Sequence, residues 1–495
     1  MTTARRIDRR GALSLAGAAL FGRCIGVHAQ SSPQPSDPQR LPPVSITRHT
    51  LELPGRTLTF EATAGSILLT DEKQAPRAEL AFVAFQREAA DRVRRPVTFA
   101  FNGGPGFASA WLNVGAVGPW RIALGADAGG SPAPAELMPN AETWLDFTDL
   151  VFIDPAGTGF SRVLASDAEA RHRLWSVDGD IEYLAEAIRR WLDEYDRSAS
   201  PRYLLGESYG GFRVPRLARA LNYNVAGLAL VSPALDLGGR SSAFAPFFYV
   251  THLPSMTAAA RARQGLVTRA MLADVERYAT TDYLLDLTRG ESDTAAIARR
   301  SERVAEFTDL DPALVQRHRG MIDNRVFLHE LYRSQGRVGS SFDATITTAD
   351  PYPSDSRREL PDPVLGGFRG PISNAMLALY ATRLNWRPAA SYELGNAQAN
   401  HKWDWGHNVW NPPQSMQSMR NALSREPRLK VLIAHGLFDL VTPYLGTQLL
   451  LDQLPPAEAD GRIRFSVYPG GHMFYTNDGS RAALRDDAAA LFGWS

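Results

Sequence analysis

Short, continuous apolar runs that each end in Gly, Pro, Asp or Ser are the feature that most limits how this chain can fold. An alternating run predicts a strand with one exposed face, whereas a continuous run predicts a strand buried on both faces, as in a parallel sheet. In such sheets the functional loops follow the carboxyl ends of the strands. The runs are PVTFAFNGG (96–104), LVFIDPAGTG (150–159), RYLLGES (202–208), GLALVSPAL (227–235), LKVLIAHG (429–436) and IRFSVYPGG (463–471).

The segments around these runs predict the rest of the core. Residues 46–88 contain short alternating stretches that are typical of antiparallel strands. Residues 178–195 carry apolar side chains at i, i+3, i+4 and i+7, which predicts a helix with one buried face. Strands and helices therefore alternate, and we expect an α/β fold with a doubly wound, mostly parallel sheet and antiparallel N-terminal strands.

A long segment divides this predicted core in two. We expect the core over 44–235 and 416–495, and a largely helical cap, inserted over 236–415, that covers the strand ends and shapes a pocket. Within the cap, the patterns predict helical stretches at 271–278, 293–307 and 374–384 and aromatic, Pro-containing loops at 244–256 and 385–394.

The N-terminal segment differs in composition from the rest. Arg9-Arg10 and the Ala/Gly/Leu-rich stretch after it predict an export signal over 1–29, with features of the twin-arginine route, although a Sec signal or an uncleaved amphipathic segment stays open. Residues 30–43 are Pro/Ser-rich and are expected to be a linker. The only cysteine, Cys24, lies inside the signal, so the exported protein would have no disulfide.

Composition excludes several classes of partner. The chain has 495 residues, with Lys+Arg 53 against Asp+Glu 53, so nothing indicates a nucleic-acid or acidic-lipid partner. No later run approaches the roughly 20 apolar residues of a membrane span. The expected partner is a peptide or a small acyl substrate, and the oligomeric state stays open.

The run at 202–208 ends in a nucleophile elbow. Gly206, Ser208 and Gly210 form G-x-S-x-G between a predicted strand and a predicted helix, where a tight turn presents the serine and glycines let helix and strand approach. This context makes Ser208 the expected nucleophile and indicates an α/β-hydrolase fold.

The partners of that serine follow from chain order. These folds place the residues in the order Ser, then Asp or Glu, then His. Asp439 follows the run at 429–436, and His472 is the only histidine beyond it. We therefore expect His472 to be the general base for Ser208 and Asp439 to orient it. Taken singly, a helix-capping Asp and a plain Gly-Gly-His turn are the simpler interpretations of the two residues.

An oxyanion hole requires two backbone N–H groups near the nucleophile. Tyr209, directly after Ser208, is expected to supply one, and Gly104 in the Gly-rich turn after the run at 96–104 is expected to supply the other. No metal or organic cofactor is expected. His401 and His407 could suggest a metal site, but they lack a clear third ligand, and a packed aromatic loop is the preferred interpretation.

Together, these motifs resemble those of the serine carboxypeptidase family, peptidase family S10. The motifs are NGGPG (102–106), DPAGTGFS (154–161), GESYGG (206–211) and GHM (471–473), with Asp439 correctly placed between the last two. The resemblance implies a triad of Ser208, Asp439 and His472 and an oxyanion hole from Gly104 and Tyr209. It further implies substrate-binding roles for residues of these motifs, namely Asn102, Gly103, Glu207 and Met473, with Asn102 and Glu207 holding the peptide's terminal carboxylate.

Departures from the family pattern keep a second function open. Ala100 and Ala116 stand where the family carries Trp and Glu, and Phe107 replaces its Cys. We expect an exported serine carboxypeptidase that favours acidic pH, because a carboxylate beside Glu207 requires that group to be protonated or hydrogen-bonded. The alternative is a serine esterase or acyltransferase on the same scaffold, and a non-catalytic binding protein is the third hypothesis. Arg121 or Arg213 could pair with a carboxylate, but a packing role is preferred for both.

Overall fold

The computed structural model describes residues 40–88, 91–124, 136–237, 245–354, 361–406, 413–459 and 461–493. Leu41–Ser495 forms one compact unit. The predicted export signal at 1–29, with Cys24, and residues 30–39 of the predicted linker lie outside the described residues. Among the helices of the described ranges, none is long and apolar enough to cross a membrane.

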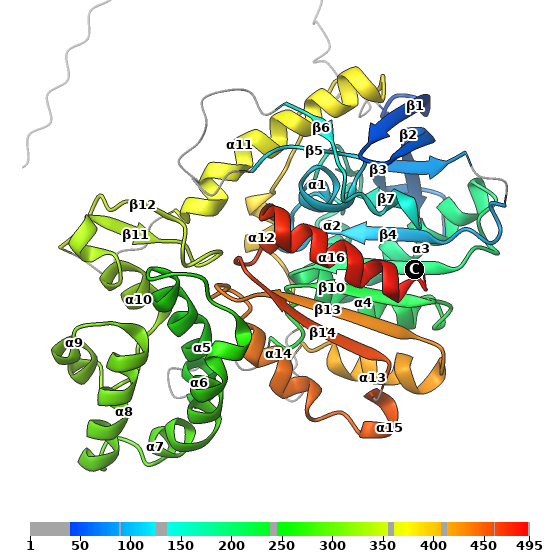
Figure 1. The fold of residues 1–495 in the computed structure, drawn as a ribbon. Helices are drawn as coiled ribbons and strands as arrows, with labels where there is room; N and C mark the ends of the chain where they lie inside the picture. Colours follow the sequence, from blue (N-terminus) through cyan, green and yellow to red (C-terminus); the bar gives the residue numbers. More distant parts are fainter. Residues whose placement is uncertain are drawn as a thin grey trace, which may run out of the picture. The chain divides into compact units, whose positions relative to one another are not determined.

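A mixed sheet runs through the unit, in the order β1-β2-β3-β7-β4-β9-β10-β13-β14 (Figure 1). Every continuous apolar run of the sequence overlaps one of its parallel strands, so that prediction and the antiparallel N-terminal strands are confirmed. The parallel strands are β4 (Val97–Phe101), β7 (Asp149–Ile153), β9 (Arg202–Glu207), β10 (Gly227–Val231), β13 (Lys430–Gly436) and β14 (Ile463–Tyr468), and the antiparallel ones are β1 (Ser45–Leu53), β2 (Arg56–Thr70) and β3 (Pro76–Arg87).

Helices cover both faces of this sheet. Successive strand residues alternate between two apolar cores, as where Leu204 packs into one and Leu205 into the other. One core includes α3 (Val177–Glu194), α4 (Tyr209–Ala220) and α13 (Met416–Arg425), and the other includes α1 (Ala110–Leu112) and α16 (Asp478–Leu491). The predicted helix at 178–195 is therefore confirmed, and its apolar face is buried as expected. Smaller elements are β5 (Trp120–Arg121), β6 (Met138–Pro139), β8 (Arg162–Val163), α2 (Ala168–Leu174), α14 (Tyr444–Leu451) and α15 (Pro456–Ala459).

The first part of the insertion forms a helical group beside the sheet, coloured green in Figure 1. It has its own apolar core, which also takes up Leu437, Leu440 and Leu445 from the segment after β13. A short antiparallel hairpin of β11 (Arg337–Gly339) and β12 (Thr347–Ala349) follows the group. The helices are α5 (Pro246–Ala262), α6 (Ala273–Tyr278), α7 (Leu284–Thr288), α8 (Thr294–Thr308), α9 (Pro312–Arg317) and α10 (Asn324–Glu330).

The loop predicted at 244–256 is wrong from Pro246 onward, because α5 begins there. Pro246 occupies the first turn, where a missing N–H costs nothing. Pro254 lies inside the helix, and a proline there removes one backbone hydrogen bond. Burial of Val250, Leu253 and Met256 in the insertion's core offsets that cost, so tertiary packing overrides the local signal.

The second part of the insertion returns to the sheet. The helix predicted at 374–384 begins earlier than expected, as α11 (Pro363–Ala378), and continues through a π-helical turn, Leu379–Arg383. Phe368 and Ile372 of α11 pack into the same core as α16. After it, α12 (Ala397–His401) lies in the stretch that leads back toward the core. The ends of the insertion meet at a bridge between Asp236 and Gln414; the domain boundaries themselves stay predictions.

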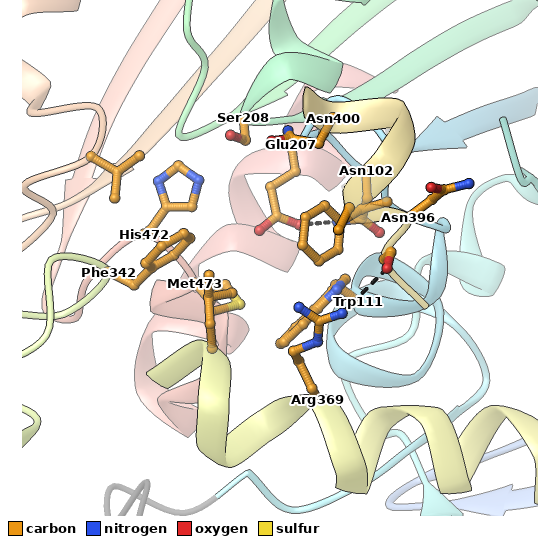
Figure 2. Close-up of a pocket in the computed structure, with 17 residues that line it drawn as sticks. Asn102, Trp111, Glu207, Ser208, Phe342, Arg369, Asn396, Asn400, His472 and Met473 are labelled. Atoms are coloured by element: carbon orange, nitrogen blue, oxygen red, sulfur yellow. Dashed lines mark hydrogen bonds between the residues drawn. The ribbon is translucent and has the colours of Figure 1, made fainter. Parts of the chain in front are cut away.

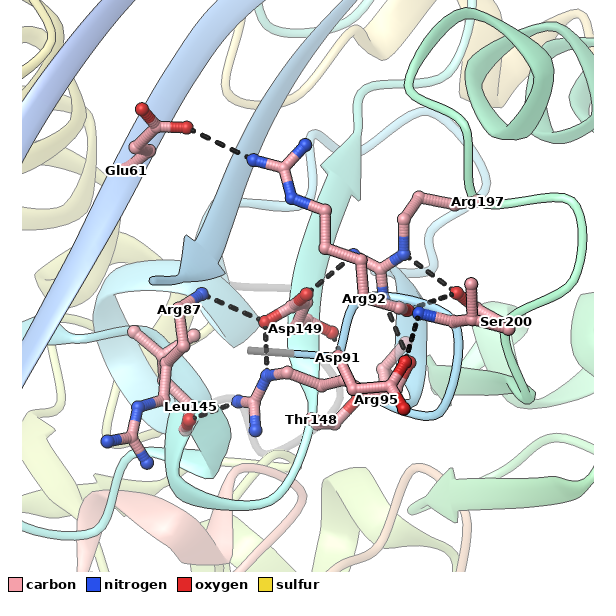
Figure 3. Close-up of polar contacts among 12 residues, drawn as sticks. Glu61, Arg87, Asp91, Arg92, Arg95, Leu145, Thr148, Asp149, Arg197 and Ser200 are labelled. Atoms are coloured by element: carbon pink, nitrogen blue, oxygen red, sulfur yellow. Dashed lines mark hydrogen bonds and ion pairs between the residues drawn. The ribbon is translucent and has the colours of Figure 1, made fainter. Parts of the chain in front are cut away.

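A buried ion cluster ties the amino ends of the strands together (Figure 3). Asp149, the first residue of β7, is 1% exposed and lies between two arginines. Arg95 Nε is 2.6 Å from its Oδ1, and Arg197 Nη1 is 2.5 Å from its Oδ2. The backbone N–H of Arg87 donates to the same carboxylate, and Arg197 also donates to Ser200 and to the carbonyl of Arg95. Each buried charge therefore has several partners, as burial requires.

We expect Asp149→Asn to destabilise the protein strongly, because it leaves two arginines without a counter-charge, one of them fully buried. Removing one partner of a buried pair costs about 3–5 kcal/mol. Urea unfolding measures this loss. Arg48→Met is the matched control, since the Arg48–Glu61 pair lies on the surface, with Arg48 77% exposed, and should barely change stability. Equal effects of both variants would contradict the role given to the cluster.

Candidate active site

The register of the parallel strands brings the predicted site residues to one edge of the sheet. Phe101 pairs with Gly206, Val231 with Glu207 and Ala434, and Gly436 with Tyr468. The segments that follow β4, β9, β13 and β14 therefore emerge at the same edge of the sheet. A cavity of about 380 Å³ opens at this edge, and all of the predicted site residues except Asp439 and Tyr209 line it (Figure 2).

Ser208 occupies a strained turn between β9 and α4. Its φ of 60° and ψ of −121° lie outside the ordinary regions for a residue with a side chain. Glycines make the turn sterically feasible: a Cβ on Gly206 would lie 2.1 Å from the carbonyl oxygen of Gly210, and one on Gly210 would lie 2.4 Å from that of Phe101. The hydroxyl group thus projects at the start of a helix, in the geometry expected of a nucleophile elbow.

Asp439 and His472 form a buried pair next to the cavity. His472 Nδ1 lies 2.8 Å from Asp439 Oδ2, and Asp439 is completely buried. A carboxylate only accepts hydrogen bonds, so Nδ1 carries a proton and Nε2 is the ring atom left to exchange one. Burial would raise the pKa of Asp439, but the charge of His472 and hydrogen bonds from His472 and Thr442 hold it below its usual value.

Further contacts orient this pair. Asp439 accepts hydrogen bonds from the backbone N–H groups of Val441 and Thr442, at 2.7 and 3.0 Å, and from the Thr442 hydroxyl at 2.7 Å. The backbone N–H of His472 donates to the carbonyl of Phe342 in the insertion, at 2.5 Å. Sequence reasoning missed Thr442, although its position three residues after Asp439 is typical of a turn closed by an aspartate side chain.

Backbone groups of two loops meet beside Ser208. Tyr209 is the first residue of α4, so its N–H has no partner within the helix. A Cβ on Gly103 would lie 2.5 Å from that nitrogen and 2.8 Å from Ser208 Cβ, so only glycine lets the loop after β4 approach so closely. Gly104, with φ of 106°, follows in the same cavity wall. The loop that carries Gly104 therefore lies against Ser208 and Tyr209, and the oxyanion hole itself stays a prediction.

Asn102 and Glu207 form a second polar pair in the cavity wall. Asn102 Nδ2 donates to Glu207 Oε2 at 2.5 Å, and its Oδ1 accepts from the N–H of Leu112 at 3.0 Å. The hydroxyl of Tyr475 lies 2.9 Å from both carboxylate oxygens of Glu207. Tyr475, three residues after His472, was not predicted, because nothing in the sequence indicates that its ring would turn back toward β9.

Glu207 is a carboxylic acid that is hard to ionise. It is 3% exposed, and burial raises its pKa to about 7, against the lowering effects of the positive charge on His472 and of hydrogen bonds from Tyr475 and Asn102. At acidic pH it is therefore neutral and able to donate a hydrogen bond. The sequence predicted a protonated or hydrogen-bonded Glu207, and the structure supplies the environment for both.

The two arginines considered for carboxylate binding have partners elsewhere. Arg213 is fully buried, with its Nε 2.6 Å from Asp180 Oδ2 and its Nη1 2.7 Å from the carbonyl oxygen of Asn102. Arg121 lies near Asp478, 3.7 Å away. Arg213 thus holds the end of β4 in place from behind the cavity, which agrees with the preferred packing role.

The insertion supplies much of the cavity wall, which no motif identified. Its contributions are Phe342, Leu365, Arg369, Gly395, Asn396, Ala397 and Asn400. Asn400 Nδ2 donates to the carbonyl of Pro105 at 2.8 Å, and the N–H of Asn396 donates to the carbonyl of Gly106 at 2.8 Å. The insertion is therefore hydrogen-bonded directly to the loop after β4.

His401 and His407 are the two residues that the sequence suggested as possible metal ligands. His401 ends α12 and is exposed, whereas His407 lies outside the described residues. In the part of the chain that the structure describes, no group of three His, Cys, Asp or Glu side chains is arranged to hold a metal ion.

The raised pKa of Glu207 predicts how stability changes with pH. The pKa of Glu207 is 4.5 in the unfolded chain and about 7 in the folded protein. At pH values between these two, only the folded state holds the proton. The contribution of Glu207 to the free energy of unfolding is complete below pH 4.5 and is lost as pH rises to 7. It amounts to about 3 kcal/mol. Glu207→Gln, which cannot ionise, should lack this loss. Urea unfolding from pH 4 to 8 measures the difference in free energy of unfolding between wild type and Glu207→Gln. The raised pKa values of Asp154 and Asp343 affect both proteins alike and cancel in this difference. A constant difference would contradict the prediction.

Comparisons with known proteins agree with this geometry. Residues 54–263 match the family model for serine carboxypeptidases. A pheromone-processing carboxypeptidase KEX1 from Phaeosphaeria nodorum is 29% identical over 179 residues, or 33% of this chain and 25% of the relative. Serine carboxypeptidase-like 5 from Arabidopsis thaliana is 27% identical over 194 residues, or 38% of this chain and 41% of the relative. The matched segments thus span less than half of these relatives.

A solved structure extends the likeness in fold over most of the chain. The prohormone-processing carboxypeptidase Kex1(delta)p from Saccharomyces cerevisiae superposes with a TM-score of 0.51 at 17% identity, covering 87% of this chain and 91% of that one. This similarity and the sheet order confirm the predicted α/β-hydrolase fold. The match over 54–263 and these relatives show that part of the chain is similar to the serine carboxypeptidases of peptidase family S10.

Proposed function

We propose that the protein is a serine carboxypeptidase that releases C-terminal residues from peptides through an acyl-enzyme. The observation that carries this proposal is the joint placement of two groups in one cavity. Ser208 and His472 line it together with the Asn102–Glu207 pair. One group can perform acyl transfer, and the other offers hydrogen-bond donors to a carboxylate at the end of a peptide.

The proposed reaction uses Ser208 as nucleophile. His472 Nε2 takes the hydroxyl proton while Oγ attacks the last peptide carbonyl, and Asp439 stabilises the imidazolium that forms. The N–H groups of Gly104 and Tyr209 donate to the oxyanion. The proton then passes from His472 to the departing amine, which leaves an ester on Ser208. Water, deprotonated by His472, attacks this ester and releases the shortened peptide.

Carboxylate recognition in this proposal depends on the proton of Glu207. When neutral, Glu207 and the amide of Asn102 can both donate hydrogen bonds toward a substrate carboxylate. When ionised, Glu207 would repel it. Since the pKa of Glu207 is about 7, the preference for free peptide acids should be strongest at acidic pH.

The second candidate function is an esterase or acyltransferase. It is favoured by Ala100 and Ala116, which are 0% and 1% exposed where the family carries a larger Trp and Glu. Small side chains there remove part of the terminal-carboxylate site and leave the acyl-transfer residues in place. We also propose export of the protein, on the basic and Ala-rich composition of residues 1–29.

We expect Ser208→Ala to abolish labelling by a serine-directed phosphonate and to lower peptide turnover by roughly a million-fold. Mass spectrometry of the labelled peptide locates the modified residue. Ser198→Ala, at an exposed serine, is the control and should label normally. Labelling of the Ser208→Ala protein would refute the assigned nucleophile, and an unreactive wild-type protein would favour a non-catalytic binding protein.

We expect the preference for a free peptide acid over the matching peptide amide to fall as pH rises through about 7. The ratio of the two kcat/KM values isolates Glu207, because pH effects on the triad act on both substrates. In Glu207→Gln the ratio should not change with pH. A wild-type ratio near one at every pH, with esters cleaved, would favour the esterase instead.

A further inference from the structure

The cavity contains one charged side chain that the proposed mechanism does not use. Of the residues that line it, only Glu207, Arg369 and His472 are ionisable. Arg369 belongs to α11 of the insertion and is exposed. Figure 2 shows its guanidinium group extending from α11 toward the cavity, in which Asn102, Glu207 and Met473 are also drawn. It thus places a permanent positive charge in the wall of the proposed substrate site.

The contacts of Arg369 leave most of its hydrogen-bonding capacity available. Its Nη2 lies 3.3 Å from the carbonyl oxygen of Gly395, a long hydrogen bond. Its guanidinium carbon lies 5.8 Å from the centre of the Phe107 ring. Within the described ranges, no carboxylate forms an ion pair with it, in contrast to Arg213, which is paired with Asp180. A guanidinium has five N–H donors in a planar fork that matches a carboxylate.

Neighbouring residues fix the position of this side chain. Gly395 pairs with Phe107 in an isolated bridge. A Cβ on Gly395 would lie 2.8 Å from the Phe107 ring and 3.2 Å from Arg369 Nη2, so glycine there makes room for both. Phe107 belongs to the loop of Gly104, and its N–H donates to the carbonyl of Gly103 at 3.2 Å. Arg369 is therefore held against the loop of the proposed oxyanion hole.

The walls near Arg369 favour an anionic ligand. Phe107, Trp111, Leu365 and Met473 line the same cavity and would exclude water from a bound residue, which strengthens a charge–charge contact. The cavity thus pairs a fixed cation with apolar walls next to Asn102 and Glu207.

We propose that Arg369 binds a carboxylate of the residue that the enzyme releases. The inference rests on the proposed function, because it takes the Asn102–Glu207 side of the cavity as the site of the leaving residue. Two carboxylates of that residue are chemically equivalent for a guanidinium. One is the terminal α-carboxylate, and the other is the side chain of a C-terminal Asp or Glu.

The test uses peptides with a blocked N-terminus that end in Glu or in Gln, each as free acid and as amide. Wild type is compared with Arg369→Met, which keeps the length of the side chain, and with Arg369→Lys, which keeps the charge but not the fork. Arg383→Met is the matched control, since Arg383 is exposed, ends the π-helical turn after α11, and lies over Trp120 at 5.7 Å, outside the cavity. Thermal unfolding midpoints verify that each variant is folded.

We expect Arg369→Met to lower kcat/KM on the Glu free acid by roughly tenfold to a hundredfold, mainly through KM, because a hydrogen-bonded charge is lost. Arg369→Lys should recover part of this loss, and Arg383→Met should show none. A loss on Glu that exceeds the loss on Gln assigns the side-chain carboxylate. An equal loss on both free acids, with a smaller one on the amides, assigns the terminal carboxylate. Equal rates of Arg369→Met and wild type on every substrate would overturn the inference and leave the carboxypeptidase proposal intact.

A second readout does not require peptide cleavage. Free glutamate and glutamine are offered as competitors while a serine-directed phosphonate labels Ser208. If Arg369 binds a carboxylate, one or both amino acids should slow labelling of wild type, and Arg369→Met should need at least tenfold more competitor. Protection that is the same in both proteins, or absent from wild type, would overturn the inference even if the protein proved to be an esterase.

Discussion

The parallel register of the central strands is the constraint on which the site depends. Backbone hydrogen bonds align β4, β9, β10 and β13 so that their carboxyl ends lie at one edge. Asn102, Ser208 and Asp439 each follow one of these strands, and His472 follows β14. Residues far apart in the chain are thereby brought to the same edge of the sheet. A slip of one residue in any strand would turn its side chains to the opposite face.

Buried polar groups fix this edge from behind. Asn102 connects three elements, since its side chain bonds Glu207 and the last residue of α1 while its carbonyl accepts from Arg213 of α4. Arg213 is in turn paired with Asp180 of α3. Removing water from such groups is costly, and each has a protein partner that offsets the cost. One result is a carboxylic acid, Glu207, whose proton is retained to an unusually high pH.

The insertion is part of the site and not merely a cover over it. Its first helices form a core of their own, and the segment around Phe342 holds the backbone of His472. Its later segment, from Gly395 to Asn400, is hydrogen-bonded to the loop of the proposed oxyanion hole. Differences in this insertion would therefore change the pocket and the positions of the proposed acyl-transfer groups together, which makes it the natural place for substrate preference to be decided under the proposed function.

The sequence by itself determined the strands, the elbow at Ser208 and the chain order that singled out Asp439 and His472, because continuous apolar runs and glycine turns are local signals. It failed for α5, where burial outweighs the local effect of two prolines. Only the tertiary structure decided which distant side chains line or support the cavity, such as Tyr475 beside Glu207 and Arg369 beside Phe107. Their contacts arise from packing between elements that no local pattern relates, as where a helix of the insertion meets the loop after β4.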